Sequence, residues 1–160
     1  MKIKRLRNAF SMITAIVIIV LMSTVAVFVM NLSGKIVKST VTQYQHEQAE
    51  LYAKSYTEYA ILEVTGNDRS VNCVDAINKH IGSPNTGNGY RIRTRIAYIV
   101  NGTEIDTSHC SGTRVLSTSV TTKETPLTII VDSYVDYQDP DNSGTAKPWL
   151  TVHRRSVQKI

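Results

Sequence analysis

The side chains best suited to chemistry are the oxygen ligands in the segment DPDNSG, residues 139–144. Asp139, Asp141 and Ser143 stand at alternate positions before a glycine, as the first ligands of a calcium loop do. The twelfth position, where an EF-hand needs a bidentate glutamate, is Leu150, so the EF-hand type is excluded. A plain turn has the same composition and is the favoured interpretation. No cofactor is expected except calcium, which stays the alternative at this segment.

The two cysteines, Cys73 and Cys110, both follow a long apolar N-terminal segment. If that segment crosses a membrane and the rest is exported, the cysteines lie where disulfides persist, and we expect them to pair. A bridge enclosing about 36 residues restricts the unfolded chain by roughly 3 to 4 kcal/mol in the loop-entropy model. Metal binding is the alternative, which two isolated cysteines without CxxC spacing disfavour.

Three arginines alternate with apolar residues along a predicted strand: Arg91, Arg93 and Arg95. Such a basic ladder could grip a nucleic-acid backbone. The favoured interpretation is a solvated strand face, paired with acidic neighbours such as Glu104 and Asp106 across a hairpin at Asn101-Gly102. A nucleic-acid partner is therefore not expected, and DNA capture at this face is the exception to test.

The charge balance also weakens a nucleic-acid interpretation. Four of the 18 Lys and Arg residues lie in the first nine positions, which leaves 14 against 13 Asp and Glu in the rest. Serine, histidine and aspartate occur nowhere in the context of a nucleophile elbow or a catalytic triad. The chain is not expected to be an enzyme.

The N-terminal segment determines on which side of a membrane the rest of the chain lies. No charged residue occurs between Arg7 and Lys35, and an apolar helix of that length can cover the ~30 Å hydrocarbon core of a bilayer. Positive charge clustered before the segment, within residues 2–7, holds that side in the cytoplasm. The remainder of the chain is then exported.

Periodicity predicts an α+β fold for the chain. The helix is expected to run from Ser11 to about Val64 and to end at Gly66, first apolar and then amphipathic. A short helix is expected over residues 70–81 and a loop over residues 82–89. Strands are expected at residues 90–100, 114–122, 126–137 and 149–157, which form a small antiparallel sheet.

The junction Arg7-Asn8-Ala9-Phe10 indicates which kind of export signal the apolar segment belongs to. A small residue followed by phenylalanine stands before the apolar core, whereas a secretory signal is cleaved after it. This arrangement resembles the class III leader of type IV pilins and type II secretion pseudopilins. The resemblance implies that a prepilin peptidase cuts after Ala9 and that Phe10 becomes the methylated first residue. Ala9 departs from the glycine that is usual there.

The resemblance also implies an organisation and a fold. Residues 1–9 would be the prepilin leader, 10–34 the transmembrane and assembly helix, 35–66 its amphipathic continuation, and 67–160 an exported antiparallel-sheet domain. A pilin-like fold lays the long N-terminal helix across that sheet, and a disulfide or a loop secures the variable end. Some pseudopilins bind calcium in a C-terminal loop, which bears on Asp139, Asp141 and Ser143.

The implied function is that of a structural subunit in a type II secretion or type IV pilus-like filament. Its expected partners are the prepilin peptidase, other pilin or pseudopilin subunits, the inner-membrane assembly platform and membrane lipid. The expected location is a single pass through the inner membrane with a periplasmic C-terminal domain. Thr14 stands where the family usually has glutamate, which suits a position at the filament tip. The alternative is a bitopic, signal-anchored protein whose exported domain binds a ligand or partner.

Overall fold

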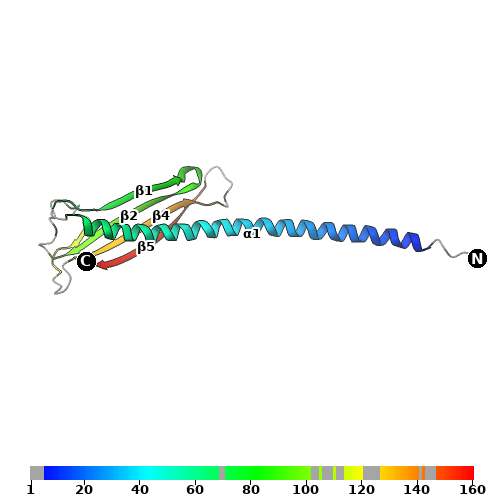
Figure 1. The fold of residues 1–160 in the computed structure, drawn as a ribbon, viewed down its shortest axis with the longest axis horizontal. Coiled ribbons are helices and arrows are strands. Elements are labelled where there is room, and N and C mark those ends of the chain that lie inside the picture. Colours follow the sequence, from blue (N-terminus) through cyan, green and yellow to red (C-terminus); the bar gives the residue numbers. More distant parts are fainter. Residues whose placement is uncertain are drawn as a thin grey trace, which may run out of the picture. The chain divides into compact units, whose positions relative to one another are not determined.

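The computed structural model describes residues 6–68, 71–101, 105, 110, 114–120, 127–140, 142 and 147–160. The chain divides into two compact units, Met1–Val41 and Thr42–Ile160. One helix, α1 (Leu6–Gly66), passes from the first unit into the second, and four long strands follow it (Figure 1).

The first unit is described as helix alone, from the start of α1 onward. Its large apolar side chains between Met12 and Leu32 are all exposed. No proline interrupts α1, and the helix continues through Gly34, where low helix propensity could have softened it. The expected helix is therefore confirmed, although it begins at Leu6 and not at Ser11; its end at Gly66 is the one that the glycine stop predicts.

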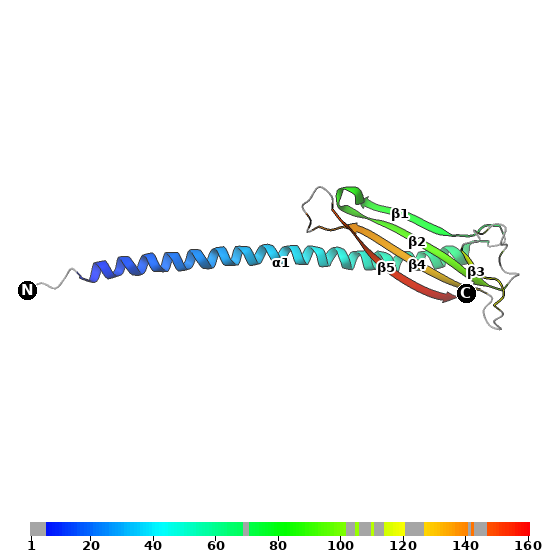
Figure 2. The ribbon, with the colours of Figure 1, turned by 180° about the vertical axis from the view of Figure 1, so that it is seen from behind.

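The second unit contains a five-stranded sheet with strand order β1-β2-β4-β5 (Figure 2). These four strands pair antiparallel, and the short strand β3 pairs parallel with β2. The bounds are β1 Ala76–Ser83, β2 Asn88–Val100, β3 Val115–Ser117, β4 Leu127–Gln138 and β5 Trp149–Lys159. The predicted α+β architecture is confirmed.

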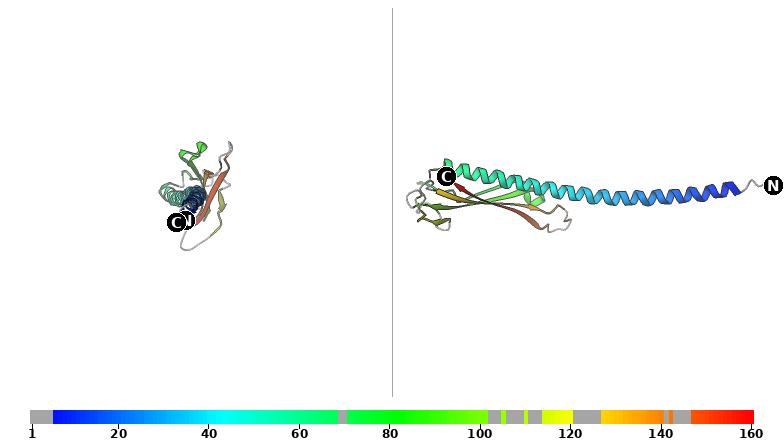
Figure 3. Two further views of the ribbon diagram at one scale, coloured as in Figure 1. Left: turned by 90° about the vertical axis from the view of Figure 1, so that its right-hand side faces the viewer. Right: turned by 90° about the horizontal axis from the view of Figure 1, so that it is seen from below.

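The part of α1 in the second unit covers one face of the sheet (Figure 3). Its buried stripe consists of small residues at helical spacing, which let the helix backbone approach the strands closely: Ala49, Ala53, Thr57 and Ala60, followed by Val64. The sheet supplies alternate side chains of β2 and β4, because successive residues of a strand point to opposite faces. The strand predicted at residues 90–100, with one buried face and one charged face, is confirmed.

Two apolar clusters between the helix and the sheet are separated by a layer of buried hydroxyl groups. The Thr57 hydroxyl lies 3.0 Å from that of Ser133, which in turn lies 3.4 Å from that of Thr94. Thr57 also donates to the Ala53 carbonyl at 2.7 Å, so the layer is internally hydrogen-bonded. Polar groups that must meet one another fix the register of the helix on the sheet.

The helix predicted over residues 70–81 is wrong. Among the described residues, a turn at Val71 and backbone without regular structure over residues 72–75 come directly before β1. β1 pairs with β2 from Ala76 opposite Arg95 to Ser83 opposite Asn88. Val71, Val74, Ile77 and Ile81 suggested a helix, but Ile77 and Ile81, four residues apart, share a face in a strand as well as in a helix. Val71, which the helix would have buried, is 63% exposed.

The loop predicted over residues 82–89 is the tip of a β-hairpin, and both strands extend into it. A 3-10 turn at Pro84–Thr86 connects them. Gly82 has a φ of +67°, and a Cβ there would lie 2.4 Å from the Asn88 carbonyl oxygen, so both its conformation and the close approach require glycine.

The strand predicted at residues 114–122 is shorter than expected, since β3 ends at Ser117. Of the proposed hairpin turn at Asn101-Gly102, only Asn101 is described, and it forms an isolated antiparallel bridge with Ser119. Gly102 and the acidic partners Glu104 and Asp106 lie outside the described residues. Within the described chain, the neighbours of β2 are β1, β3 and β4.

Candidate functional site

The first candidate region is the apolar part of α1 in the first unit. The segment is long and apolar enough to cross a membrane once, and its span has no buried residues. Two of its hydroxyl groups are satisfied within the helix: Ser23 donates to the Ile19 carbonyl at 2.8 Å, and Thr24 donates to the Leu21 carbonyl at 2.8 Å. Such a helix presents no unpaired backbone to lipid or to apolar neighbours.

The predicted processing and assembly residues lie at the start of this helix. Ala9 and Phe10 are within α1, and Thr14 follows Phe10 by about one turn. Thr14 is exposed, as are the neighbouring apolar residues of the helix. These residues are close to one another because they share a helix, whereas the cysteines and the 139–144 segment belong to the second unit.

The predicted disulfide between Cys73 and Cys110 is confirmed. The two Cα atoms are 5.1 Å apart, and both residues are largely buried beside the apolar cluster at the C-terminal end of α1. The bridge ties the chain just after α1 to the segment between β2 and β3, so it secures this end of the domain.

The candidate calcium ligands are only partly described. The Asp139 amide donates to the Pro148 carbonyl at 3.0 Å, which closes the base of the connection between β4 and β5. Asp141 and Ser143 lie outside the described residues. Among the residues that the structure describes, no group of three His, Cys, Asp or Glu side chains could hold a metal ion.

The second candidate region is the face of the sheet opposite α1, which we call the outer face. Cross-strand register places charged and aromatic side chains of β2, β4 and β5 in adjacent rows there: Arg91, Arg93, Arg95, Asp132, Tyr134, Asp136, Trp149, Thr151, His153 and Arg155. The alternation that buries one side of each strand therefore gathers its charges on the other.

Asp136 is the centre of this face. Its side chain is only 1% exposed, yet it accepts hydrogen bonds at 3.0 Å from Arg91 Nε, at 3.0 Å from both Nε and Nη2 of Arg93, and at 2.8 Å from Thr151 Oγ1. Burial by itself would raise the pKa of Asp136, but these hydrogen bonds outweigh it and hold the pKa below its usual value.

Asp132 forms a second, more exposed centre. Arg155 donates to both of its carboxylate oxygens, at 2.7 and 2.9 Å, and His153 Nε2 lies 2.8 Å from Oδ1. The Arg155 hydrogen bonds are the main reason that the pKa of Asp132 lies below its usual value; partial burial opposes them and His153 assists.

Aromatic rings hold the cationic groups of this face in place. The Arg91 guanidinium lies 4.4 Å from the centre of the Trp149 ring, and that of Arg93 lies 5.7 Å from the Tyr134 ring. His153 stacks on Tyr134 with ring centres 4.4 Å apart. The guanidinium groups of Arg91 and Arg93 are therefore oriented by a carboxylate and a ring, and that of Arg155 by a carboxylate.

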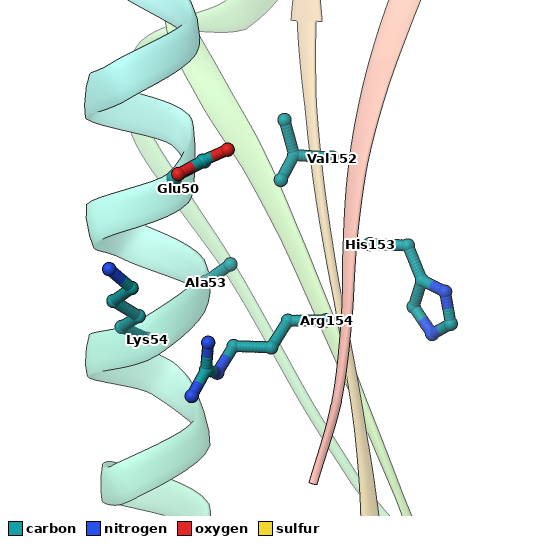
Figure 4. Close-up of a pocket in the computed structure, with 6 residues that line it drawn as sticks. All are labelled: Glu50, Ala53, Lys54, Val152, His153 and Arg154. Carbon is teal, nitrogen blue, oxygen red and sulfur yellow. The ribbon is translucent and has the colours of Figure 1, made fainter.

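A shallow groove runs between α1 and the edge strand β5 (Figure 4). Ala53 and Val152 line it, with Glu50, Lys54 and Arg154 around them. Arg154 reaches toward the helix, whereas His153 points away from it (Figure 4). The side chains of these neighbouring β5 residues thus lie on opposite faces of the sheet.

No protein-family model, curated protein or solved structure matches this chain. The assignment of a function therefore depends on the residues and the geometry themselves.

Sequence reasoning missed the partners of the arginines. Arg91 and Arg93 bind Asp136 on β4, and Arg95 Nη1 donates to Asn78 Oδ1 on β1 at 3.1 Å. A signal was present, because Asp132 and Asp136 stand on the polar side of an alternating strand. The pairing of that strand with β2 was the missing information.

Proposed function

We propose that this chain is a structural filament subunit of the pilin or pseudopilin type, which assembles through the apolar part of α1. The observation that carries the proposal is a single uninterrupted helix with two different surfaces. Residues Met12–Leu32 expose apolar side chains, whereas the part from Ala49 to Val64 buries a stripe of small residues against a sheet. A helix built in this way can anchor a folded domain while it offers its other end to a bilayer or to similar helices.

The physical basis of assembly is the exposed apolar surface itself. In water such a surface is unfavourable, and it is stable only in lipid or among other apolar helices. Tight packing between apolar helices can replace lipid contacts when a subunit leaves the membrane. The Cys73–Cys110 disulfide supports an exported domain, since disulfides persist outside the cytoplasm.

Orientation follows from the basic N-terminal residues. Cationic residues before the apolar segment favour a cytoplasmic N-terminus and a domain on the outer side of the inner membrane. A prepilin peptidase would then cut between Ala9 and Phe10, and the assembly platform would receive the processed chain. The role is structural, and the partners are other subunits of the same filament.

Thr14 supports a position at the tip of the filament. In the family that the leader resembles, a glutamate at this position is thought to neutralise the amino terminus of a neighbouring subunit. A buried, unpaired ammonium group costs several kcal/mol even after relaxation, and a threonine hydroxyl supplies no charge. A subunit with no other ahead of it has no amine to neutralise. Counting subunits in sheared filaments tests this: a low copy number is expected, and predominance of this chain would exclude the tip.

The alternative is a bitopic protein that keeps its N-terminus and binds a partner through its exported domain. The apolar segment of α1 suits that role equally well. The two functions differ in processing, because only a filament subunit has to lose residues 1–9.

The test is the intact mass of the protein isolated from a host with and without its prepilin peptidase. We expect the loss of residues 1–9 and one added methyl group on Phe10 only when the peptidase is present. An Ala9→Leu variant, with a bulky residue before the cut, should keep its leader and serves as the control. A wild-type chain that retains residues 1–9 in the presence of the peptidase would favour the bitopic anchor.

A further inference from the structure

The outer face carries more positive charge than its own carboxylates neutralise. On β2, β4 and β5 it presents four arginines (Arg91, Arg93, Arg95 and Arg155), and the only acidic side chains that face them there are Asp132 and Asp136. Three of these arginine side chains are accessible, at 38% for Arg91, 43% for Arg93 and 62% for Arg155. The face is therefore cationic and reachable from solvent.

The guanidinium groups also keep hydrogen-bonding capacity. Each has five N–H donors, and within the described chain none of the four uses more than two of them on protein acceptors. Toward the residues that the structure describes, Arg91 donates through Nε alone, and it is held against Trp149, so its orientation is set while its terminal nitrogens have no acceptor among them. Guanidinium groups that are already oriented can donate to a carboxylate without a further loss of side-chain freedom.

The spacing of these groups matches an extended polypeptide. Arg91, Arg93 and Arg95 are alternate residues of one strand, so their side chains recur about every 6.6–6.8 Å. Alternate side chains of an extended peptide recur at the same distance. An acidic residue at every second position of a ligand could therefore meet each arginine in turn.

The aromatic residues argue against single-stranded nucleic acid as the ligand. Sequence-tolerant binding of single strands uses exposed rings on which bases stack. On this face the Trp149 ring is covered by Arg91, and the Tyr134 ring is stacked on His153. The rings orient protein side chains here, which leaves charge and hydrogen bonding as the means of recognition.

We infer that the outer face of the sheet is a docking surface for an extended acidic segment of a partner protein. The interaction goes beyond assembly through α1, because it uses the opposite face of the sheet and different residues. It does not depend on whether the chain forms filaments.

The test uses the full-length chain in uncharged detergent and fluorescent poly-L-glutamate as the probe, with affinity measured by anisotropy at physiological salt. Arg95→Gln removes a charge of the outer face. Within the described part of the chain, the Arg95 side chain bonds to exposed Asn78 and to no buried carboxylate. Arg154→Gln removes the same charge from the neighbouring strand region on the opposite face. We expect Arg95→Gln to weaken binding by about three- to fivefold, as for one exposed charge contact, and Arg154→Gln by less than twofold.

Competition with a single-stranded oligothymidylate separates the two ligand classes. We expect poly-L-glutamate to remain bound at oligonucleotide concentrations that match it in charge. Displacement by the oligonucleotide, equal effects of the two substitutions, or no binding of poly-L-glutamate would each overturn the inference. Unchanged far-ultraviolet circular dichroism of both variants shows that any difference is not caused by unfolding.

Discussion

Replacing Asp136 by asparagine should destabilise the sheet domain more than its location on a solvent-facing surface suggests. The carboxylate accepts four hydrogen bonds, three of them from arginines, while only 1% of its side chain is exposed. An amide keeps one acceptor oxygen and turns a donor toward the guanidinium groups, so about two of these bonds are lost. At ~1.5–3 kcal/mol for each charged hydrogen bond, offset by rehydration of the partly exposed arginines, we expect a loss of about 2 to 4 kcal/mol.

Asp132→Asn is the matched control for this measurement. It changes the same group on the same strand and face, but Asp132 is 15% exposed and its partners His153 and Arg155 are 42% and 62% exposed. Exposed ion pairs contribute little, so a clearly smaller loss is expected. Chemical denaturation can be followed through Trp149, the one tryptophan, whose ring lies against Arg91. A loss for Asp136→Asn that is no larger than that for Asp132→Asn would refute the reasoning.

Three further predictions concern the second unit. Because Asp132 and Asp136 have lowered pKa values in the folded state, their stabilisation is present above their ordinary pKa near 3.8 and is lost as pH falls below it. The free energy of unfolding of the wild type should therefore decrease as the pH is lowered below about 4, and that of Asp136→Asn should decrease less steeply. Replacing Cys73 and Cys110 by serine should lower the free energy of unfolding by about 3 to 4 kcal/mol. An unchanged denaturation midpoint would contradict this. If residues 139–144 form a plain turn, millimolar calcium leaves the melting temperature unchanged, whereas a rise would establish the calcium site.

The parts of the fold that sequence predicted well are those with long, unambiguous patterns. Arg91, Arg93 and Arg95 recur at every second position within residues 90–100, a period of two that is typical of a strand. The uncharged run before Lys35 and the glycine at position 66 likewise define α1 from local information.

The error at residues 70–81 has a physical cause. The pattern there rested on Val71, Val74, Ile77 and Ile81 at spacings of three and four. The spacing of four between Ile77 and Ile81 fits both a helix and a strand. Residues 76–83 form a strand because β2 pairs with β1 along the whole length of β1. Pairing between strands depends on residues that are distant in sequence, and a single pattern does not reveal it.

The partners of the charged residues on the outer face also depend on strand pairing that a local sequence pattern does not reveal. The three arginines of β2 were recognisable in the sequence, but their partners were sought in the nearest acidic residues of the chain. Asp136 binds Arg91 across a separation of 45 residues, and the strand order β1-β2-β4-β5 is what brings them together. Sequence reasoning thus identified the charged strand face, and the topology determined how it is neutralised.

The central claim is that α1 carries this chain into a filament, and filament composition tests it most directly. Filaments sheared from hosts with and without the prepilin peptidase can be purified and quantified by mass spectrometry, with this chain counted against the most abundant subunit. The account predicts that the chain is present in the filaments at a low ratio and begins at Phe10, and that it stays in the membrane when the peptidase is missing. A chain found only in the membrane fraction of both hosts would contradict it.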